Sequence, residues 1–214
     1  MKKRKDGLER KTLLLEAATK GFAKKGFRET TISDICKAAH SNTASVNYYF
    51  GSKEELYAEV WKEAFHNALK KYPPDMELPP HAAPEDRLRA FIKSLLHKML
   101  DTGELGDAGQ ILLMEMTNPT EAIDLVKWDA IEPMQKRMHS ILQQLLGKQA
   151  SQEDIAFCAM SVIHQCIGFG FKRGKLPPPL LGMDKAKLIE ALSRHITIFS
   201  LSGIKAIKKR ITRS

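Results

Sequence analysis

Residues 30–56 read TTISDICKAAHSNTASVNYYFGSKEEL, and this stretch sets the fold that we expect for the front of the chain. Thr31–Asp34 has the pattern of a capping box, in which a threonine and an acidic residue three positions later close the start of a helix. A polar turn at His40–Asn42 separates that helix from a second short helix, Thr43–Tyr49. A further capping-box pattern, Ser52–Glu55, opens a third helix. Two short helices at a tight polar turn predict a helix-turn-helix.

The second helix of a helix-turn-helix enters the major groove of DNA, so its side chains are the first candidates for DNA contact. Here it is uncharged and rich in hydroxyl, amide and phenol groups, which can contact base edges and phosphates. We expect Asn42 to cap this helix, Asn47 to bond an adenine edge and Lys53 to bind phosphate. The predicted DNA-contacting residues are Thr31, Asn42, Thr43, Ala44, Ser45, Asn47, Tyr48, Tyr49 and Lys53. The alternative for Asn47 is a plain surface position, and for Tyr48 and Tyr49 a place in the small core.

Positive charge is concentrated at the two ends of the chain. The 214 residues carry a net charge of +9, and 43% are apolar, which indicates a folded protein long enough for two domains. Residues 1–50 hold 11 Lys/Arg against 5 Asp/Glu, and residues 203–214 hold 5 Lys/Arg and no acids. Basic ends on a near-neutral body favour a polyanionic partner. The alternative for MKKRK is a solvated tail; IKAIKKRITRS is either a frayed extension of the last helix or a helix on an anionic membrane.

The remaining sequence shows helical periodicity and no alternating strand pattern, so the predicted fold class is all-α. Residues 8–25 predict a helix that ends at Gly26, and five prolines mark a connector at residues 73–84. Later helices are expected at 85–100, 106–117, 120–147, 151–171 and 184–201. We therefore predict a three-helix DNA-binding domain at 1–55 and a helical ligand-binding and dimerisation domain at 56–214, connected by the helix 53–71.

The front of the chain resembles the TetR (tetracycline repressor) family, with a first helix that ends GFxxTT, then the turn, then a YxF-type end followed by SKEEL. The resemblance covers residues 8–65, and AxxNxAxVNYxFGSKEEL is similar to the subgroup with a CerR-type C-terminal domain. It implies a homodimeric one-component regulator, usually a repressor. A small ligand in the C-terminal domain would alter the spacing of the two reading heads and release the operator. His40 departs from the glycine that the family often has there, and Ser41 from an apolar turn residue.

The helices 151–171 and 184–201 have wide apolar faces that need cover on two sides, which predicts a dimer interface. The resemblance implies that they pair with their mates as a four-helix bundle. The predicted interface residues are Ile155, Ala159, Val162, Ile163, Ile167, Leu188, Leu192, Ile196 and Phe199. The alternative is that these faces form the domain's own core.

A ligand cavity would be lined from the helices between residues 85 and 171. The predicted lining residues are His97, Met114, Trp128, Met138, His164 and Phe169, and the alternative for each of them is an ordinary core position. Nine methionines suit an apolar or aromatic effector, because methionine side chains repack around varied shapes.

Other kinds of site have little support in the sequence. No HxxxH pair is present, and Cys158 and Cys166 lie about two helical turns apart, so no metal site is expected. No phosphate loop, nucleophile elbow or HExxH predicts an enzyme, and no cofactor is expected. No apolar run reaches the roughly 18 residues of a membrane helix, and polar residues follow MKKRK, so we expect no membrane and a reduced cytoplasm.

The predicted function is therefore sequence-specific regulation of transcription. We expect a homodimer that binds a palindromic operator in double-stranded DNA as a repressor, relieved by an unidentified small organic effector. One rival is a DNA-binding activator, or an adaptor tuned by another protein, that takes no small ligand. A second rival is a ligand-binding helical protein whose front domain is vestigial.

Overall fold

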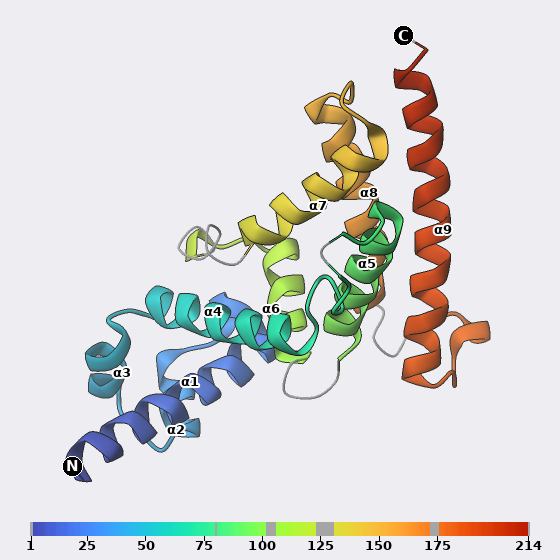
Figure 1. The fold of residues 1–214 in the computed structure, drawn as a ribbon. Coiled ribbons are helices and arrows are strands. Elements are labelled where there is room, and N and C mark those ends of the chain that lie inside the picture. Colours follow the sequence, from blue (N-terminus) through green and yellow to red (C-terminus); the bar gives the residue numbers. More distant parts are fainter. Residues whose placement is uncertain (1, 80, 102–105, 123–130, 172–175, 214) are drawn as a thin grey trace. The chain divides into compact units, whose positions relative to one another are not determined.

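The computed structural model describes residues 2–79, 81–101, 106–122, 131–171 and 176–213, and every regular element in these ranges is helical (Figure 1). The all-α prediction is confirmed for these ranges. By their internal contacts, the residues form two compact units. The N-terminal unit comprises residues 1–68 and 102–131, and the C-terminal unit comprises residues 69–101 and 132–214. The predicted division at residue 55 is a division by function, and it stays a prediction.

The first helix, α1 (Lys2–Glu29), begins earlier than its periodicity predicted and is broken at Gly26. The φ angle of Gly26 is +78°, a left-handed backbone that glycine adopts without strain, so the predicted helix end is a break in the helix. Leu14, Ala18 and Phe22 are fully buried along one face of α1, as their spacing predicted.

Four further helices complete the N-terminal unit: α2 (Ile32–Ala38), α3 (Thr43–Phe50), α4 (Lys53–Lys71, whose last residues belong to the other unit) and α6 (Gly106–Thr117). α6 packs along α1, although more than 70 residues separate the two in the sequence. The ring of Tyr57 on α4 lies 4.9 Å from that of Phe22 and 5.0 Å from that of Phe27. An aromatic cluster thus joins α4 to α1.

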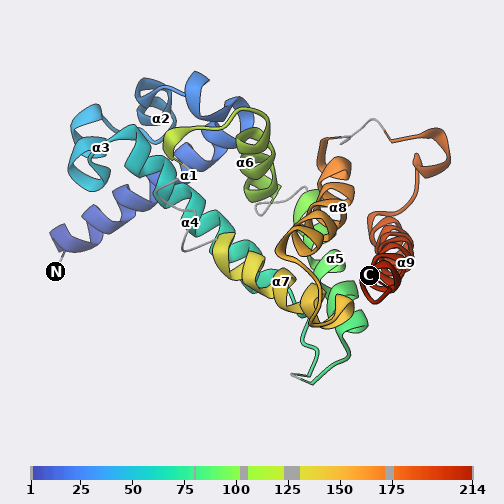
Figure 2. The ribbon, with the colours of Figure 1, turned by 90° about the horizontal axis from the view of Figure 1, so that it is seen from above.

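The C-terminal unit is built around α5 (Pro84–Leu100), which packs against α7 (Glu132–Leu146), α8 (Gln152–Phe171) and α9 (Lys185–Ile211). Figures 1 and 2 both show α5 beside α8 and α9. Pro133 stands in the first turn of α7, so it starts a helix rather than kinking one. α9 extends ten residues beyond its predicted end at 201, as the helical reading of the basic end implies. The beginning of the predicted helix 120–147 includes residues outside the described ranges.

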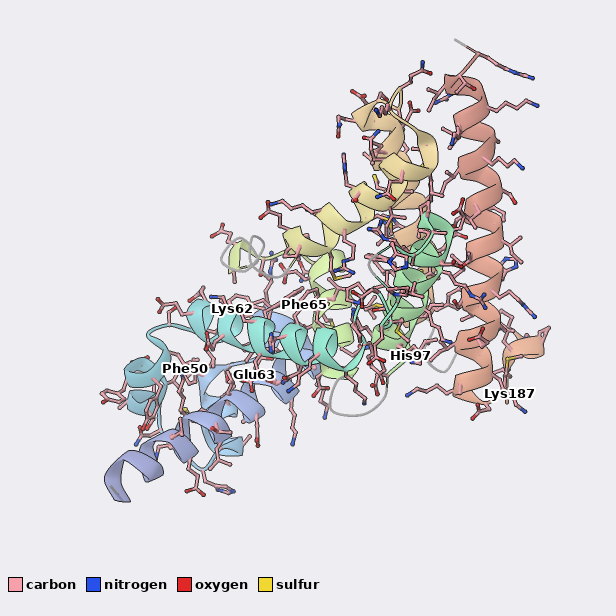
Figure 3. The ribbon with its side chains drawn as sticks, in the orientation of Figure 1. Phe50, Lys62, Glu63, Phe65, His97 and Lys187 are labelled. Atoms are coloured by element: carbon pink, nitrogen blue, oxygen red, sulfur yellow. The ribbon has the colours of Figure 1, made fainter. Side chains whose placement is uncertain are left out.

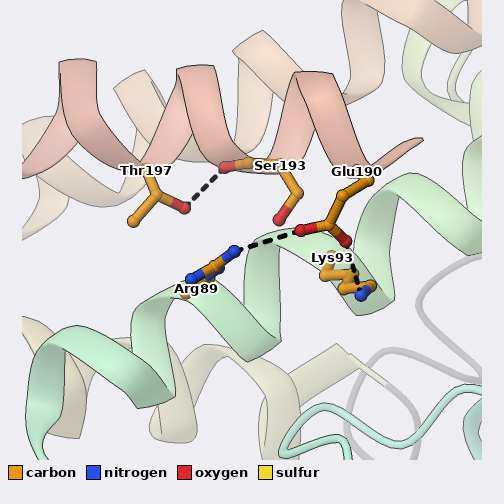
Figure 4. Close-up of polar contacts among 5 residues, drawn as sticks. All are labelled: Arg89, Lys93, Glu190, Ser193 and Thr197. Carbon is orange, nitrogen blue, oxygen red and sulfur yellow. Dashed lines mark hydrogen bonds and ion pairs between the residues drawn. The ribbon is translucent and has the colours of Figure 1, made fainter. Parts of the chain in front are cut away.

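Ion pairs on the surface link α5 to α9. Arg89 and Lys93 both contact the carboxylate of Glu190, at 3.1 and 2.7 Å (Figure 4). Within α9, the hydroxyl of Thr197 donates to the carbonyl of Ser193 at 2.6 Å. Exposed ion pairs contribute little to stability, so the buried apolar faces of the two helices carry most of this contact. Of the described helices, none is long and apolar enough to cross a membrane.

Candidate nucleic-acid interface

Local hydrogen bonds fix the turn between α2 and α3. The hydroxyl of Thr31 accepts the amide of Asp34 at 3.1 Å, and the Asp34 carboxylate accepts the amide of Thr31 at 3.5 Å. These bonds are the main reason why the pKa of Asp34 lies below its ordinary value. His40 has φ of +48°, and the amide of Ser41 closes the helix end on the carbonyl of Cys36 at 2.8 Å. The predicted capping box and the left-handed His40 are confirmed.

Asn42 caps α3, and this cap changes the role of one predicted residue. The Asn42 side-chain oxygen accepts the amide of Ser45 at 2.9 Å and its hydroxyl at 3.0 Å. Ser45 is buried, so its hydroxyl serves the cap and does not lie on the outer face of the helix. The cap of Asn42 is confirmed, whereas the expectation that Ser45 points toward a DNA groove is corrected.

One face of α3 is exposed, and we call Thr43, Ala44, Asn47 and Tyr48 the α3 face. Their spacing of one and four residues places them on the same side of the helix. Tyr48 is 82% exposed, whereas Val46 and Phe50 on the opposite side are buried. The ring of the half-buried Tyr49 packs edge-on against Tyr48 at 5.0 Å. The face therefore offers hydroxyl, methyl, amide and phenol groups to a partner.

Lysines flank the α3 face. The ammonium of Lys53 lies 4.4 Å from the ring centroid of Phe27, and partial burial lowers the pKa of Lys53. The ammonium of Lys11, on α1, lies 5.5 Å from the ring centroid of Phe50, the last residue of α3 (labelled in Figure 3). Lys37 is exposed in the last turn of α2. The sequence analysis missed Lys11, because no local pattern pairs residues 39 positions apart.

The structure does not gather the predicted ligand-lining residues around one cavity. His97 is half-buried and stacks on Tyr72 at 4.8 Å, and burial is the main cause that lowers the pKa of His97. Met138 is a core residue, His164 is exposed, and Phe169 is half-buried. The other two are Met114, which is half-buried in the N-terminal unit, and Trp128, which lies outside the described residues.

Two hollows of about 610 and 320 Å³ lie in the N-terminal unit, and none of the six predicted residues lines either of them. The larger one runs between α1 and α2, over Leu13, Ala17 and Ile35. Its rim carries both basic and acidic side chains, including the ion pair of Lys25 with Asp34 at 3.6 Å.

The predicted dimer residues need a similar correction. Six of them, Ile155, Val162, Ile167, Leu188, Leu192 and Ile196, are buried inside the single chain, so they form the unit's own core. Ala159 and Ile163 are half-buried. Only Phe199 of the predicted set is strongly exposed, at 64%. Helical periodicity marks apolar stripes, and it cannot say which stripe of a helix that is apolar on two sides faces outward.

The exposed large apolar side chains of α8 and α9 are Phe157, Met160, Ile198 and Phe199, which we call the outer apolar face. Each of them is at least 55% exposed. The side chain of Gln165 on α8 donates to the hydroxyl of Ser200 on α9 at 3.3 Å, so the two helices lie side by side at this edge. Phe157, Met160 and Ile198 were not predicted.

The fold and the α3 face together define a helix-turn-helix transcriptional regulator. Residues 14–60 match the profile of the bacterial regulatory proteins of the tetR family, and residues 84–204 match the C-terminal domain of the HTH-type transcriptional dual regulator CecR. The chain therefore belongs to the TetR family of DNA-binding transcriptional regulators, with a C-terminal domain of the CecR type. The subgroup predicted under the label CerR-type is thus the CecR subgroup.

Individual relatives agree with this family. The dual regulator CecR of Shigella flexneri is 26% identical over 179 residues, which cover 76% of each chain. The HTH-type transcriptional repressor NicS of Pseudomonas putida is 38% identical over 82 residues, which cover 37% of this chain and 36% of NicS. A TetR-like regulator from Rhodococcus sp. RHA1 shares the fold, with a TM-score of 0.65 and 17% identity over 92% of this chain and 96% of its own. These relatives are transcriptional regulators rather than enzymes.

Proposed function

We propose that the protein acts as a homodimer whose two α3 helices read the half-sites of a palindromic operator. The observation that carries this proposal is the α3 face, an exposed strip of groups that complement base edges. Asn47 would bond an adenine edge, and Ala44 and the Thr43 methyl would meet thymine methyls. Because the Asn42 cap and the closed turn before it hold α3 in place, these groups reach the groove already oriented.

The lysines around the α3 face would bind the DNA backbone. Lys53 and the exposed Lys37 are placed on helices that flank α3, and Lys11 reaches its end from α1. Phosphate contacts fix the orientation of a protein on the duplex and release counterions, but they carry no sequence information themselves. The Thr31 hydroxyl and the Tyr48 phenol would add neutral contacts to the same phosphates.

The outer apolar face supports the homodimer. Four large apolar side chains on two adjacent helices would be removed from water if the same face of a second copy covered them. Such an interface has two-fold symmetry, and a two-fold dimer places its reading heads on half-sites about one helical turn apart or slightly more. The two-fold symmetry of the protein thus accounts for a palindromic operator.

We further infer that the protein represses transcription in the cytoplasm and is relieved by a small organic effector bound by the helical domain, residues 56–214. Effector relief and dimerisation are typical of the family. The named relatives include a repressor, NicS, and a dual regulator, CecR, so activation is the rival outcome. No catalytic role is proposed.

Selection of binding sites from randomised duplex DNA with purified, ligand-free protein tests this function. We expect an enriched palindrome of two half-sites, and an Asn47→Ala variant that no longer discriminates one position of each half-site. Asn67→Ala, which removes an exposed amide from α4, is the matched control and should select the wild-type site. Dimeric protein that enriches no palindrome would contradict the proposal. In vitro transcription from a promoter that carries the site then separates repression from activation.

A further inference from the structure

Lys98 is a buried cation in the C-terminal unit without a carboxylate partner. The residue lies on α5 and is only 4% exposed. Within the described ranges, the only partner of its ammonium is the hydroxyl of Ser94, at 2.9 Å. Burial lowers the pKa of Lys98 from 10.5 to about 8, and the charged form still predominates at neutral pH. The chain therefore places a positive charge inside the unit and supplies it with a single neutral oxygen.

The neighbouring polar groups are engaged in contacts of their own. The Ser94 hydroxyl donates its proton to the backbone carbonyl of Tyr72 at 2.8 Å, so it can only accept from Lys98. The buried carboxylate of Asp101, one turn further along α5, accepts the phenol of Tyr72 at 2.7 Å. Lys71 lies 3.4 Å and Lys185 3.7 Å from the same carboxylate. The nearest acid on the helix is thus bound by other groups.

An ammonium has three protons to donate, and Ser94 accepts one of them. A buried charge without compensating hydrogen bonds is unfavourable, and a methionine of similar length would fill the same space without that cost. A lysine at this position becomes favourable when an anion accepts the two remaining protons. A carboxylate does so with charge-assisted hydrogen bonds, which are among the strongest in proteins.

We propose that Lys98 is the anion-binding residue of the effector site, and that the effector is a small organic carboxylate with an apolar body. The carboxylate would lie against the Lys98 ammonium, and the apolar body against buried aliphatic and methionine side chains of α5 and α7, such as Leu95, Met99 and Met138. Methionine side chains can repack around a body of varied shape. This inference rests on the proposed effector binding by the C-terminal part of the chain.

The test compares carboxylates with their uncharged amides on the full-length protein. Butyrate, octanoate, dodecanoate and benzoate are each measured beside the matching amide, first by thermal shift and then, for the strongest, by calorimetry. We expect at least one carboxylate to raise the melting temperature of the wild type when its amide does not. Lys98→Met should weaken the binding of that carboxylate about tenfold to a hundredfold, as expected for the loss of a charged hydrogen bond.

Two variants keep the result interpretable. Lys187→Met removes an exposed lysine of α9 (labelled in Figure 3) and should bind the carboxylate as the wild type does. Lys98→Arg retains the charge and should keep the preference for carboxylate over amide. The inference is overturned if no carboxylate of the panel stabilises the wild type, if acid and amide bind equally, or if Lys98→Met binds the acid as tightly as the wild type.

DNA binding is measured separately, on the duplex obtained by selection, so that the two proposals fail independently. Protein that binds its operator but does not distinguish carboxylate from amide contradicts the anion site alone. Protein that selects no DNA, yet requires Lys98 for carboxylate binding, contradicts the proposed regulation alone. If both hold, the carboxylate should release the operator from the wild type at concentrations that leave Lys98→Met bound.

Discussion

The phenol of Tyr57 on α4 donates a hydrogen bond of 2.8 Å to the carboxylate of Glu115 on α6, and both residues are buried in the N-terminal unit. Glu115 also accepts the hydroxyl of Thr120 at 3.0 Å. Burial, together with this bond, raises the pKa of Tyr57, so the phenol stays protonated and remains a donor. The ring of Tyr57 packs on Phe22 of α1. One side chain therefore joins three helices of the unit that carries the α3 face.

Tyr57→Phe removes the phenol and leaves the buried Glu115 carboxylate with fewer donors. We expect the free energy of unfolding to fall by about 1–3 kcal/mol, because a buried acceptor loses its partner while the ring packing is kept. Urea denaturation followed by circular dichroism measures the change. Tyr48→Phe, which alters an exposed tyrosine of the same unit, should stay within about 0.5 kcal/mol of the wild type. Equal stability of both variants would show that the bond contributes nothing.

Asn42→Ala removes the cap of α3. The variant should lose about 1 kcal/mol of stability, since two donors of Ser45 lose their acceptor. Asn42→Asp supplies a capping oxygen and should restore that stability in the same denaturation experiment. If the alanine variant is as stable as the wild type, α3 does not depend on its cap.

Asn47 and Lys53 should affect DNA binding in different ways. Asn47→Ala should cost about 1–3 kcal/mol on the selected operator and little on random duplex, because a base contact is lost. Lys53→Ala should weaken binding to both duplexes similarly and reduce the slope of log K against log salt by about one. Fluorescence anisotropy at several salt concentrations separates the two effects. An equal loss on both duplexes for Asn47→Ala would remove Asn47 from the base-reading residues.

Phe199→Asp places a charge in the outer apolar face. We expect a dimer to dissociate into monomers, since an unpaired charge would be buried between the two copies. Light scattering after size-exclusion chromatography measures the mass. Leu181→Asp, which changes another exposed leucine-sized position between α8 and α9, is the control and should leave the dimer intact. A dimeric Phe199→Asp protein would place the interface elsewhere.

Lys98→Met should stabilise the ligand-free protein at neutral pH. A pKa lowered from 10.5 to about 8 corresponds to a penalty on the order of 3 kcal/mol when the lysine is charged in both states. Above pH 8 the folded protein loses this proton while the unfolded chain keeps it up to pH 10.5, so the wild type should regain stability relative to the variant. The exposed Lys187→Met should stay within about 0.5 kcal/mol of the wild type throughout. His97, with a pKa below 6.5, titrates outside this window.

Local signals were sufficient to predict the helix-turn-helix. The capping box at Thr31, the left-handed His40 and the Asn42 cap involve residues within a few positions of one another, so spacing in the sequence determines their contacts. Features that depend on distant residues were not predictable in the same way. Nothing near Lys98 in the sequence indicates that its ammonium is buried, and Lys11 meets Phe50 only in the folded chain.

The dimer prediction shows the same limit for apolar residues. Ile163 and Phe157 are equally suited to an interface by residue type and helical spacing, yet one is half-buried and the other is 66% exposed. The difference arises from the helices that cover α8 on one side, which the periodicity of α8 itself does not contain.

The order of the two units along the chain constrains how such regulators can be recombined. The chain passes from one unit to the other three times, after residues 68, 101 and 131, because α6 belongs with α1 rather than with its neighbours in sequence. A hybrid gene that exchanges only residues 1–68 with a relative would place a foreign α1 and Tyr57 against the native α6 and Glu115. Grafting a new DNA specificity onto this protein therefore calls for two inserted segments, residues 1–68 and 102–131, transferred together.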